Sequence, residues 1–241
     1  MSKVLVNFVQ DRSGSMQAVW DETLSGFKAF VNELREKGKQ DGVEYLFSLT
    51  TFDTLVETPM VAQAIDKVDV HALKKHGPRG MTALYDAVGA TIQNTDANRH
   101  GAEKIVVVIV TDGQENSSRE WDKDRLHSSI DEKLKAGDWT FTYLGTQPET
   151  WADAGAFGLA ATAATYTPAM AGKAYFAVAA SVTRLAASKH RSSRDLMGEW
   201  LSAEERAEAG ISKEEAAEKK PPLPEPPKTE APEKKKSGRW R

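Results

Sequence analysis

The sequence contains no cysteine, which excludes a disulfide framework, a thiolate zinc site and a cysteine nucleophile. It also lacks any apolar run near the roughly 20 residues that a helix needs to cross a bilayer, so we expect no membrane association. The first residues, MSKVLVNF, have no apolar stretch of the kind found in signal peptides. These absences together predict a cytoplasmic protein.

Motifs of the common enzyme classes are missing as well. The sequence has no P-loop, no G-x-G-x-x-G, no G-x-S-x-G and no H-E-x-x-H, and its five histidines show no metal-ligand spacing. The formal net charge of -3 argues neither strongly for nor strongly against a nucleic-acid partner, but no dense basic stretch interrupts the first 190 residues, so we do not expect one. We therefore predict that the protein is not an enzyme.

Composition divides the 241 residues into two parts. Residues 1–190 have the hydrophobic content of one ordinary globular domain. Residues 191–241 carry six of the ten prolines and many charged side chains, and a segment of this kind cannot bury enough surface to offset its chain entropy. We expect a C-terminal tail that is helical over residues 196–217, with Ser202 and Glu205 as a capping pair, and disordered beyond.

Alternating strand and helix patterns in residues 1–190 predict an α/β fold. Strands are expected over residues 4–9, 43–52, 104–111 and 139–145, with a short last strand near 165–166. Between them lie amphipathic patterns for helices that end near Gly38, span 82–95, stop at Gly137, and span 169–189. The strands over 4–9 and 104–111 are the most apolar, as expected at the centre of a parallel sheet.

The connection after residues 43–52 is too short for a crossover helix. A turn at Asp53 and Thr54 leads directly to residues 55–57, and Pro59 is expected to end the strand there. So short a link predicts a hairpin, and therefore an antiparallel edge strand. The predicted fold is Rossmann-like, with a mostly parallel central sheet, one antiparallel edge strand and helices on both faces.

The loop after the first strand is rich in oxygen. Asp11 offers a carboxylate, Ser13 and Ser15 offer hydroxyls on alternate residues, and Gly14 allows a tight turn. Oxygen ligands without sulfur or imidazole suit a hard cation, Mg²⁺ or Mn²⁺, rather than zinc or copper. The alternative for this loop alone is a helix N-cap whose hydroxyls bond the backbone.

Two further loops bear on that choice. Asp112 directly follows the most apolar strand, and Thr82 lies between glycine-rich residues and a helix. If the two central strands are adjacent, their carboxyl ends open a crevice at a topological switch point, with Asp11 and Asp112 on its rim. The loop that carries Thr82 can close over the same crevice.

These three loops resemble the metal-ion-dependent adhesion site of von Willebrand factor A-type domains. The matching elements are Asp11-x-Ser13-x-Ser15, the threonine of Gly80-Met81-Thr82, and Asp112-Gly113 after a hydrophobic strand. The resemblance covers roughly residues 3–190, and without disulfides the chain looks most similar to intracellular prokaryotic or phage members. It implies that Ser13 and Ser15 bind the metal directly, and that Asp11, Thr82 and Asp112 bind directly or through water.

The resemblance also implies a function: binding of a protein partner that supplies an Asp or Glu carboxylate to the metal. The tail has glutamates that could occupy the same position in cis or from a neighbouring molecule, namely Glu214, Glu215, Glu218, Glu225, Glu230 and Glu233. One alternative is a metal-dependent hydrolase of the phosphatase type, although Ser13 stands where such enzymes usually place a second acid. Another is tethering to nucleic acid or acidic surfaces by the Lys/Arg-rich terminus.

Overall fold

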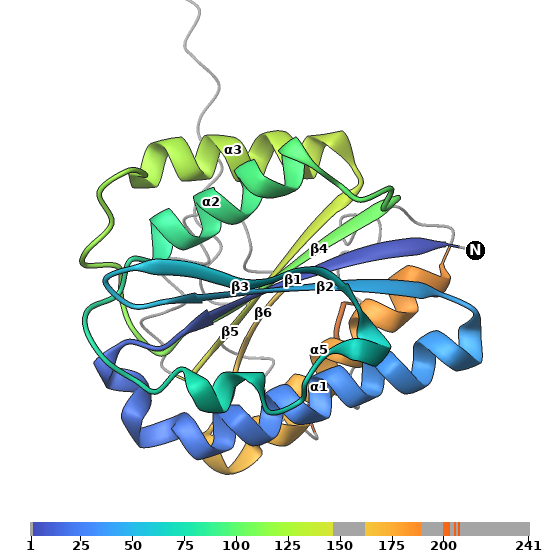
Figure 1. The fold of residues 1–241 in the computed structure, drawn as a ribbon, viewed down its shortest axis with the longest axis horizontal. Coiled ribbons are helices and arrows are strands. Elements are labelled where there is room, and N and C mark those ends of the chain that lie inside the picture. The colour runs from blue at the N-terminus through green and yellow to red at the C-terminus, as the bar shows by residue number, and fades with distance from the viewer. Residues whose placement is uncertain (1, 147–161, 189–199, 203–204, 206, 208–241) are drawn as a thin grey trace, which may run out of the picture.

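The computed structural model describes residues 2–146, 162–188, 200–202, 205 and 207. Six strands form one sheet in the order β3-β2-β1-β4-β5-β6 (Figure 1). All neighbouring strands are parallel except β2 and β3, which are antiparallel. The strands are β1 Lys3–Asp11, β2 Glu44–Phe52, β3 Val56–Ala64, β4 Lys104–Val110, β5 Trp139–Gly145 and β6 Ala163–Thr165.

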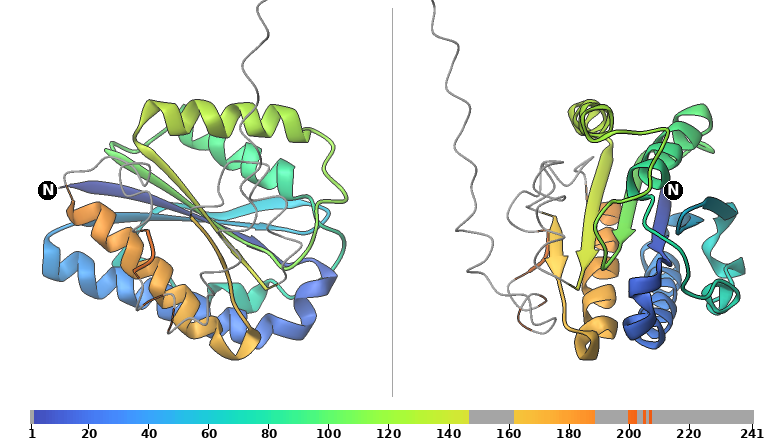
Figure 2. Two further views of the ribbon diagram at one scale, coloured as in Figure 1. Left: turned by 180° about the vertical axis from the view of Figure 1, so that it is seen from behind. Right: turned by 90° about the vertical axis from the view of Figure 1, so that its left-hand side faces the viewer.

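Helices cover both faces of this sheet. α1 (Trp20–Asp41) and α5 (Ala171–Ala187) lie on one face, and α2 (Leu84–Ala97) and α3 (Lys123–Ala136) lie on the other (Figures 1 and 2). Short 3₁₀ helices complete the connections: η1 Gly14–Val19, η2 Ile65–Lys67, η3 Ala72–Lys75 and η4 Pro168–Met170. The predicted fold class, including the antiparallel edge strand, is confirmed. Among the described residues, no helix is both long enough and apolar enough to span a membrane.

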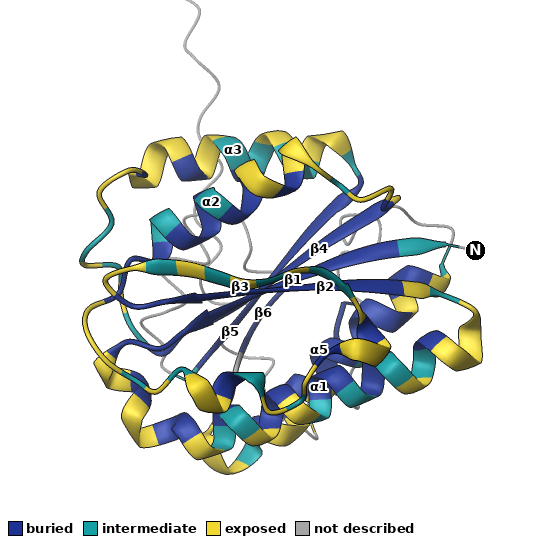
Figure 3. Cartoon of the chain, viewed as in Figure 1, coloured by how far each residue is buried: buried dark blue, intermediate teal, exposed yellow. Residues whose placement is uncertain are grey.

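Strand β1 divides the core in two, because successive side chains of a strand point to opposite faces. Val4, Val6 and Phe8 pack in the cluster with α1 and α5, whereas Leu5 and Val9 pack in the cluster with α2 and α3. All strands except the edge strand β3 are dark through their middle in Figure 3, because helices cover them on both faces. Burial on both faces explains why β1 and β4 are nearly continuous apolar runs.

The two most apolar strands are neighbours at the centre of the sheet. β1 pairs with β4 in parallel from Val4 opposite Lys104 to Gln10 opposite Val110. From β1 the chain proceeds through α1 to β2 on one side, and from β4 it proceeds through α3 to β5 on the other. The strand order therefore reverses between β1 and β4, and the predicted switch point lies at their carboxyl ends.

Two boundaries differ from those expected. α1 does not end near Gly38 but continues to Asp41, because Gly42 (φ 65°) supplies the left-handed cap and donates its N–H to the Gly38 carbonyl. Gly38 instead allows close packing, since a Cβ there would lie 3.0 Å from the Tyr45 ring.

The second difference is at Pro59, which does not end β3. The strand continues to Ala64, and Pro59 is exposed. β3 is the edge of the sheet, where a residue without an N–H costs no ladder hydrogen bond if that position faces outward. The expectation of a strand limited to residues 55–57 was therefore wrong.

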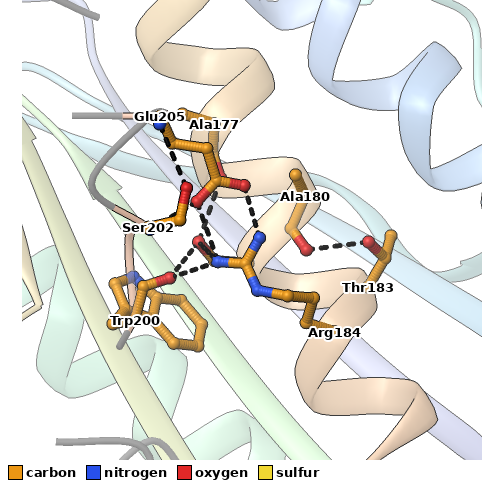
Figure 4. A network of polar contacts seen from close by, with 8 residues as sticks. Ala177, Ala180, Thr183, Arg184, Trp200, Ser202 and Glu205 are labelled. Carbon is orange, nitrogen blue, oxygen red and sulfur yellow. Dashed lines mark hydrogen bonds and ion pairs between the residues drawn. The ribbon is translucent and has the colours of Figure 1, made fainter. Parts of the chain in front are cut away.

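Residues beyond α5 contribute to the core. Trp200 and Leu201 are buried, and the Trp200 indole N–H donates to the Thr142 hydroxyl at 3.2 Å. Arg184 of α5 donates to the Trp200 carbonyl at 2.7 Å and forms an ion pair with Glu205 (Figure 4).

The predicted capping pair, Ser202 and Glu205, is confirmed. The Ser202 N–H donates to the Glu205 carboxylate at 2.7 Å, and the Glu205 N–H donates to the Ser202 hydroxyl at 3.1 Å. Residues 200–202, which lead into this cap, are not helical, so the helix expected over residues 196–217 was wrong there; most of its remainder, and all of the predicted disordered tail, lies outside the described residues.

Candidate metal centre

Asp11 is the last residue of β1, and its side chain is held by two hydrogen bonds. Its Oδ1 accepts the N–H of Ser13 at 2.6 Å, and its Oδ2 accepts the hydroxyl of Thr111 at 2.6 Å. Asp11 is fully buried. Thr111, one residue beyond β4, was not anticipated as part of the site, and it fixes the orientation of the carboxylate across the strand pair.

The two serines connect the loop after β1, here the first loop, to the loop after β4, here the third loop. The Ser13 and Ser15 hydroxyl oxygens lie 3.0 Å apart, and Ser15 donates to the Asp112 carboxylate at 2.7 Å. Ser13 occupies the N-cap position of η1, but its side chain makes no cap hydrogen bond. The helix-cap interpretation of this loop therefore does not describe Ser13, whose hydroxyl faces other oxygens instead.

Gly113 shows where the oxygens converge. A Cβ on Gly113 would lie 3.1 Å from Thr82 Oγ1, 3.3 Å from Ser15 Oγ and 3.6 Å from Asp11 Oδ2. Side chains from two loops thus surround the space beside this glycine of the third loop, and Asp112 of that loop joins them through Ser15. The structure brings all five predicted residues together at the carboxyl ends of β1 and β4.

The third loop, which follows Asp112, is held rigidly against α2 by side chains that the sequence analysis did not identify. Asn116 accepts the Thr82 N–H at 2.8 Å and returns its own N–H to the Thr82 carbonyl at 3.0 Å. Asp86 accepts the N–H groups of three successive residues, Arg119 to Trp121, at 2.8 to 2.9 Å. Glu115 accepts the N–H groups of Tyr85, Ser117 and Ser118. These bonds fix the position of Thr82 relative to the loop that follows Asp112.

The loop that bears Thr82 is also fixed to the first loop. The Arg79 N–H donates to the Arg12 carbonyl at 2.8 Å, and the Gly14 N–H donates to the Gly80 carbonyl at 3.2 Å. Below this contact, the buried Arg12 guanidinium pairs with the buried Asp53 carboxylate at 3.1 Å. Because both charges are buried and paired, each would be costly to leave alone, which stabilises this arrangement of loops.

Burial changes the acidity of the two carboxyl groups. Desolvation, opposed by the hydrogen bonds from Thr111 and Ser13 and assisted by the nearby Asp112, raises the pKa of Asp11 to about 6. Burial likewise raises the pKa of Asp112, against the hydrogen bond from Ser15. Two carboxylates brought together in a partly dry site are favoured in their ionised form by a cation between them.

The donor set fits a hard divalent cation. It consists of two carboxylates and three hydroxyls, all oxygen, around a space that a single methyl group would fill. Among the described residues, no group of three or more His, Cys, Asp or Glu side chains is arranged to hold a metal, so any site here depends on the hydroxyls. The two carboxylates would formally neutralise such an ion, and the three hydroxyls would add no further charge.

Comparison with protein-family models and with curated proteins finds no match for this chain. Solved structures do match its fold. A von Willebrand factor type A protein from Catenulispora acidiphila has a TM-score of 0.56 and 16% identity over 76% of this chain and 43% of its own. Proximal thread matrix protein 1 from the mussel byssus has a TM-score of 0.54 and 19% identity, over 79% and 48%. The vWF domain of the type V pili tip protein Mfa5 from Porphyromonas gingivalis has a TM-score of 0.56 and 13% identity, over 76% and 96%.

The chain has the fold of a von Willebrand factor A-type domain. At these identities the likeness concerns the fold alone, and it confirms the fold that the three loops led us to expect. The chain spans less than half the length of the first two of these structures. In this von Willebrand factor A-type fold, the five oxygen-bearing residues lie at the switch point between β1 and β4.

Proposed function

We propose that this protein binds other proteins through a divalent cation, Mg²⁺ or Mn²⁺, held by Asp11, Ser13, Ser15, Thr82 and Asp112. The observation that supports this most strongly is the convergence of the Asp11, Ser15 and Thr82 oxygens, from two separate loops, beside Gly113 of a third loop whose Asp112 accepts a hydrogen bond from Ser15. A structural role alone would not require Thr82, Ser15 and Asp11 to face the same point.

The chemistry of the donor set favours binding over catalysis. Two carboxylates formally neutralise a divalent cation, and hydroxyl ligands add no charge, so the cation would keep an affinity for one more anionic oxygen. An Asp or Glu side chain from a partner meets that requirement. Thr111, Asn116 and the Arg12–Asp53 pair would hold the ligand loops in place while the partner binds.

Two of the structures with this fold are consistent with such a role. One is described as the domain of a pili tip protein and another as a thread matrix protein, and neither description is that of an enzyme. Because one fold supports many functions, this is an argument by analogy and is secondary to the site itself.

A phosphatase-like hydrolase is the alternative that we consider less well supported. Both oxygens of Asp11 accept hydrogen bonds from within the protein, and the position two residues later holds Ser13 rather than a second acid. A nucleophilic carboxylate would need an exposed oxygen and a nearby proton donor. Steady release of phosphate from generic phosphomonoesters would restore this alternative.

The C-terminal segment extends the proposal. If the tail is disordered, as its composition predicts, one of its glutamates would have an effective concentration near the millimolar range, enough to compete with weak partners or to join two molecules. Tethering to nucleic acid or acidic surfaces by the same segment would instead weaken steeply with added salt. The cytoplasmic location expected from the sequence stays a prediction.

The test is capture of partner proteins by the immobilised full-length chain in Mg²⁺ and in excess chelator, followed by identification of the captured proteins. Partners should be lost in chelator, and lost equally when Ser15→Ala or Asp112→Ala replaces the wild type in Mg²⁺. A tail-deleted chain should retain these partners or bind them more tightly. Capture that does not depend on the metal would contradict the proposed function.

A further inference from the structure

Exposed apolar side chains lie on the rim of the sheet beside the candidate metal site. Two apolar side chains are exposed there although most of the protein's large apolar residues are buried: Leu55 is 61% exposed and Met81 is 51% exposed. Met81 directly precedes Thr82. Its N–H donates to the Thr54 hydroxyl at 3.0 Å, which joins the Met81 loop to the turn that carries Leu55.

The contacts between these two loops make them one surface. The Ala83 N–H donates to the Asp53 carbonyl at 2.8 Å, and Asp53 also accepts the Leu55 N–H on its side chain at 2.8 Å. Gly80 (φ 68°) approaches the turn so closely that a Cβ there would lie 2.8 Å from Thr54 Oγ1. Leu55 and Met81 therefore lie on two loops that are bonded to each other beside the candidate cation site, and we call this pair of exposed side chains the apolar ledge.

A basic group lies next to this ledge. The Arg79 side chain is 58% exposed, and its Nε donates to the buried Asp53 carboxylate at 2.8 Å. Within the described residues, no hydrogen bond engages the two terminal nitrogens of Arg79. Asp53 thus orients the guanidinium through Nε. The two terminal nitrogens form a planar fork that remains available to bind a carboxylate with two parallel hydrogen bonds.

Exposed basic side chains precede Arg79 in the chain, and the acids that act on Arg79 itself are Asp53 and Glu57. Lys74 and Lys75 of η3 are exposed, and no acidic residue occurs between Ala72 and Arg79. The pKa of His76 is lowered by burial and by Arg12, Lys75 and Arg79 together, against the opposing charge of Glu57, which shows that these cations lie near one another. An acidic segment is the complement of such a surface.

We propose that the partner presents an acidic–apolar–acidic segment to this rim. One carboxylate completes the cation's coordination, the apolar side chain packs on the ledge of Leu55 and Met81, and the second carboxylate pairs with the free fork of Arg79. This assignment rests on the proposed function, and it specifies which partner sequences the site selects. Desolvated apolar contacts and oriented arginines are the groups that contribute most to affinity in protein interfaces.

The experiment uses a displayed library of random linear peptides, captured by the full-length protein in Mg²⁺ and eluted with chelator. Peptides recovered by the wild type should be enriched in a Leu, Ile, Met or Phe that lies beside one acidic residue and within two positions of another. Met81→Ser and Leu55→Ser should remove the apolar preference and weaken a selected peptide about tenfold. Val61→Ser is the matched control, since Val61 is 62% exposed but lies on the edge strand β3.

Arg79 is tested with the same selected peptides. Arg79→Ala should remove the preference for the second acid, and Arg79→Lys should restore it only in part, because lysine keeps the charge without the planar fork. Chelator-eluted peptides that contain an acid without any apolar or second-acid preference would overturn this inference and leave the metal-dependent function intact. Failure to recover any chelator-sensitive peptide would count against the proposed function as well.

Discussion

Asp11 combines complete burial with a position at the rim of the sheet, and this combination has consequences for pH. Its pKa is raised from the ordinary 3.8 to about 6, mainly by desolvation. Metal ligands must be deprotonated, so protons and the cation compete for this carboxylate. We expect the Mg²⁺ affinity to fall about tenfold for each pH unit below about 6. Calorimetric titrations between pH 5 and pH 8 should show this, and an affinity independent of pH would contradict it.

The same shift predicts how the metal-free protein responds to pH. A carboxyl whose pKa is higher in the folded state than in the unfolded state stabilises the fold below its unfolded pKa, and this contribution is lost as pH rises through its folded pKa. For Asp11, stability in chelator should fall by up to about 3 kcal/mol between about pH 4 and pH 6. Urea unfolding measures this, and Asp11→Asn should remove most of the dependence.

Thr111 provides a test of the support that the sequence analysis missed. Its hydroxyl donates to Asp11 Oδ2 at 2.6 Å, so Thr111→Val should misorient the carboxylate while preserving the shape of the side chain. Groups that orient metal ligands typically affect affinity about 10- to 100-fold, and we expect a loss of Mg²⁺ affinity in that range. Thr91→Val is the matched control, because buried Thr91 bonds within α2 instead. Equal Mg²⁺ affinity in the two variants would show that Thr111 has no such role.

The five candidate ligands were predictable at the level of single residues because their order and type match a known constellation. Their supports were not predictable in this way. Thr111, Asn116 and Asp86 act through hydrogen bonds that join residues 33 to 100 positions apart in the sequence. No local periodicity marks such a residue, and only the packed fold shows which backbone groups need an acceptor.

At the scale of elements, the packing of α1 on α5 depends on a small residue. A Cβ at Gly26 would lie 2.7 Å from the Tyr175 ring, too close for either helix to accept without moving. We expect Gly26→Ala to destabilise the fold by about 1–3 kcal/mol. Gly172→Ala on α5 is the control, because nothing lies within 4 Å of a Cβ there. Denaturant unfolding in chelator should separate the two variants, and similar stabilities would contradict this packing.

The sequence predicted these elements more accurately than it predicted their boundaries. The strands β1 and β4 were identified by their apolar runs, and the hairpin to β3 was identified by the shortness of its connection. The end of α1 and the continuation of β3 through Pro59 were not. In each case a residue known as a breaker, Gly38 or Pro59, is tolerated because of its tertiary position.

At the scale of the whole molecule, the C-terminal segment completes the core. Trp200 is 1% exposed and bonded to Thr142, and Arg184 bonds its carbonyl. Trp200→Ala should therefore cost about 3–5 kcal/mol, whereas Phe176→Ala, at a side chain 47% exposed, should cost much less. Thermal unfolding of the two variants measures this difference, and equal losses of stability would contradict it.

Truncation of the chain also tests whether the segment that carries Trp200 stabilises the domain. Ending the chain after residue 190 removes Trp200 and should lower stability by a similar amount to Trp200→Ala, whereas ending it after residue 207 keeps the anchor and should not. Equal stability of the two truncated chains would show that the anchor does not contribute. Composition alone placed the boundary at residue 190, since Trp200 by itself changes the composition of a charged, proline-rich segment little.

The central claim is that three loops hold one divalent cation, and titration calorimetry with Mg²⁺ at neutral pH tests it most directly. The wild type should bind Mg²⁺ at a single site and become more heat-stable with it, because a ligand of the folded state alone stabilises that state. Asp11→Ala should abolish the binding and keep the fold, with Asp66→Asn, an exposed carboxylate in η2, as the control for lost charge. Unchanged Mg²⁺ binding in Asp11→Ala, or no binding by the wild type, would contradict the account.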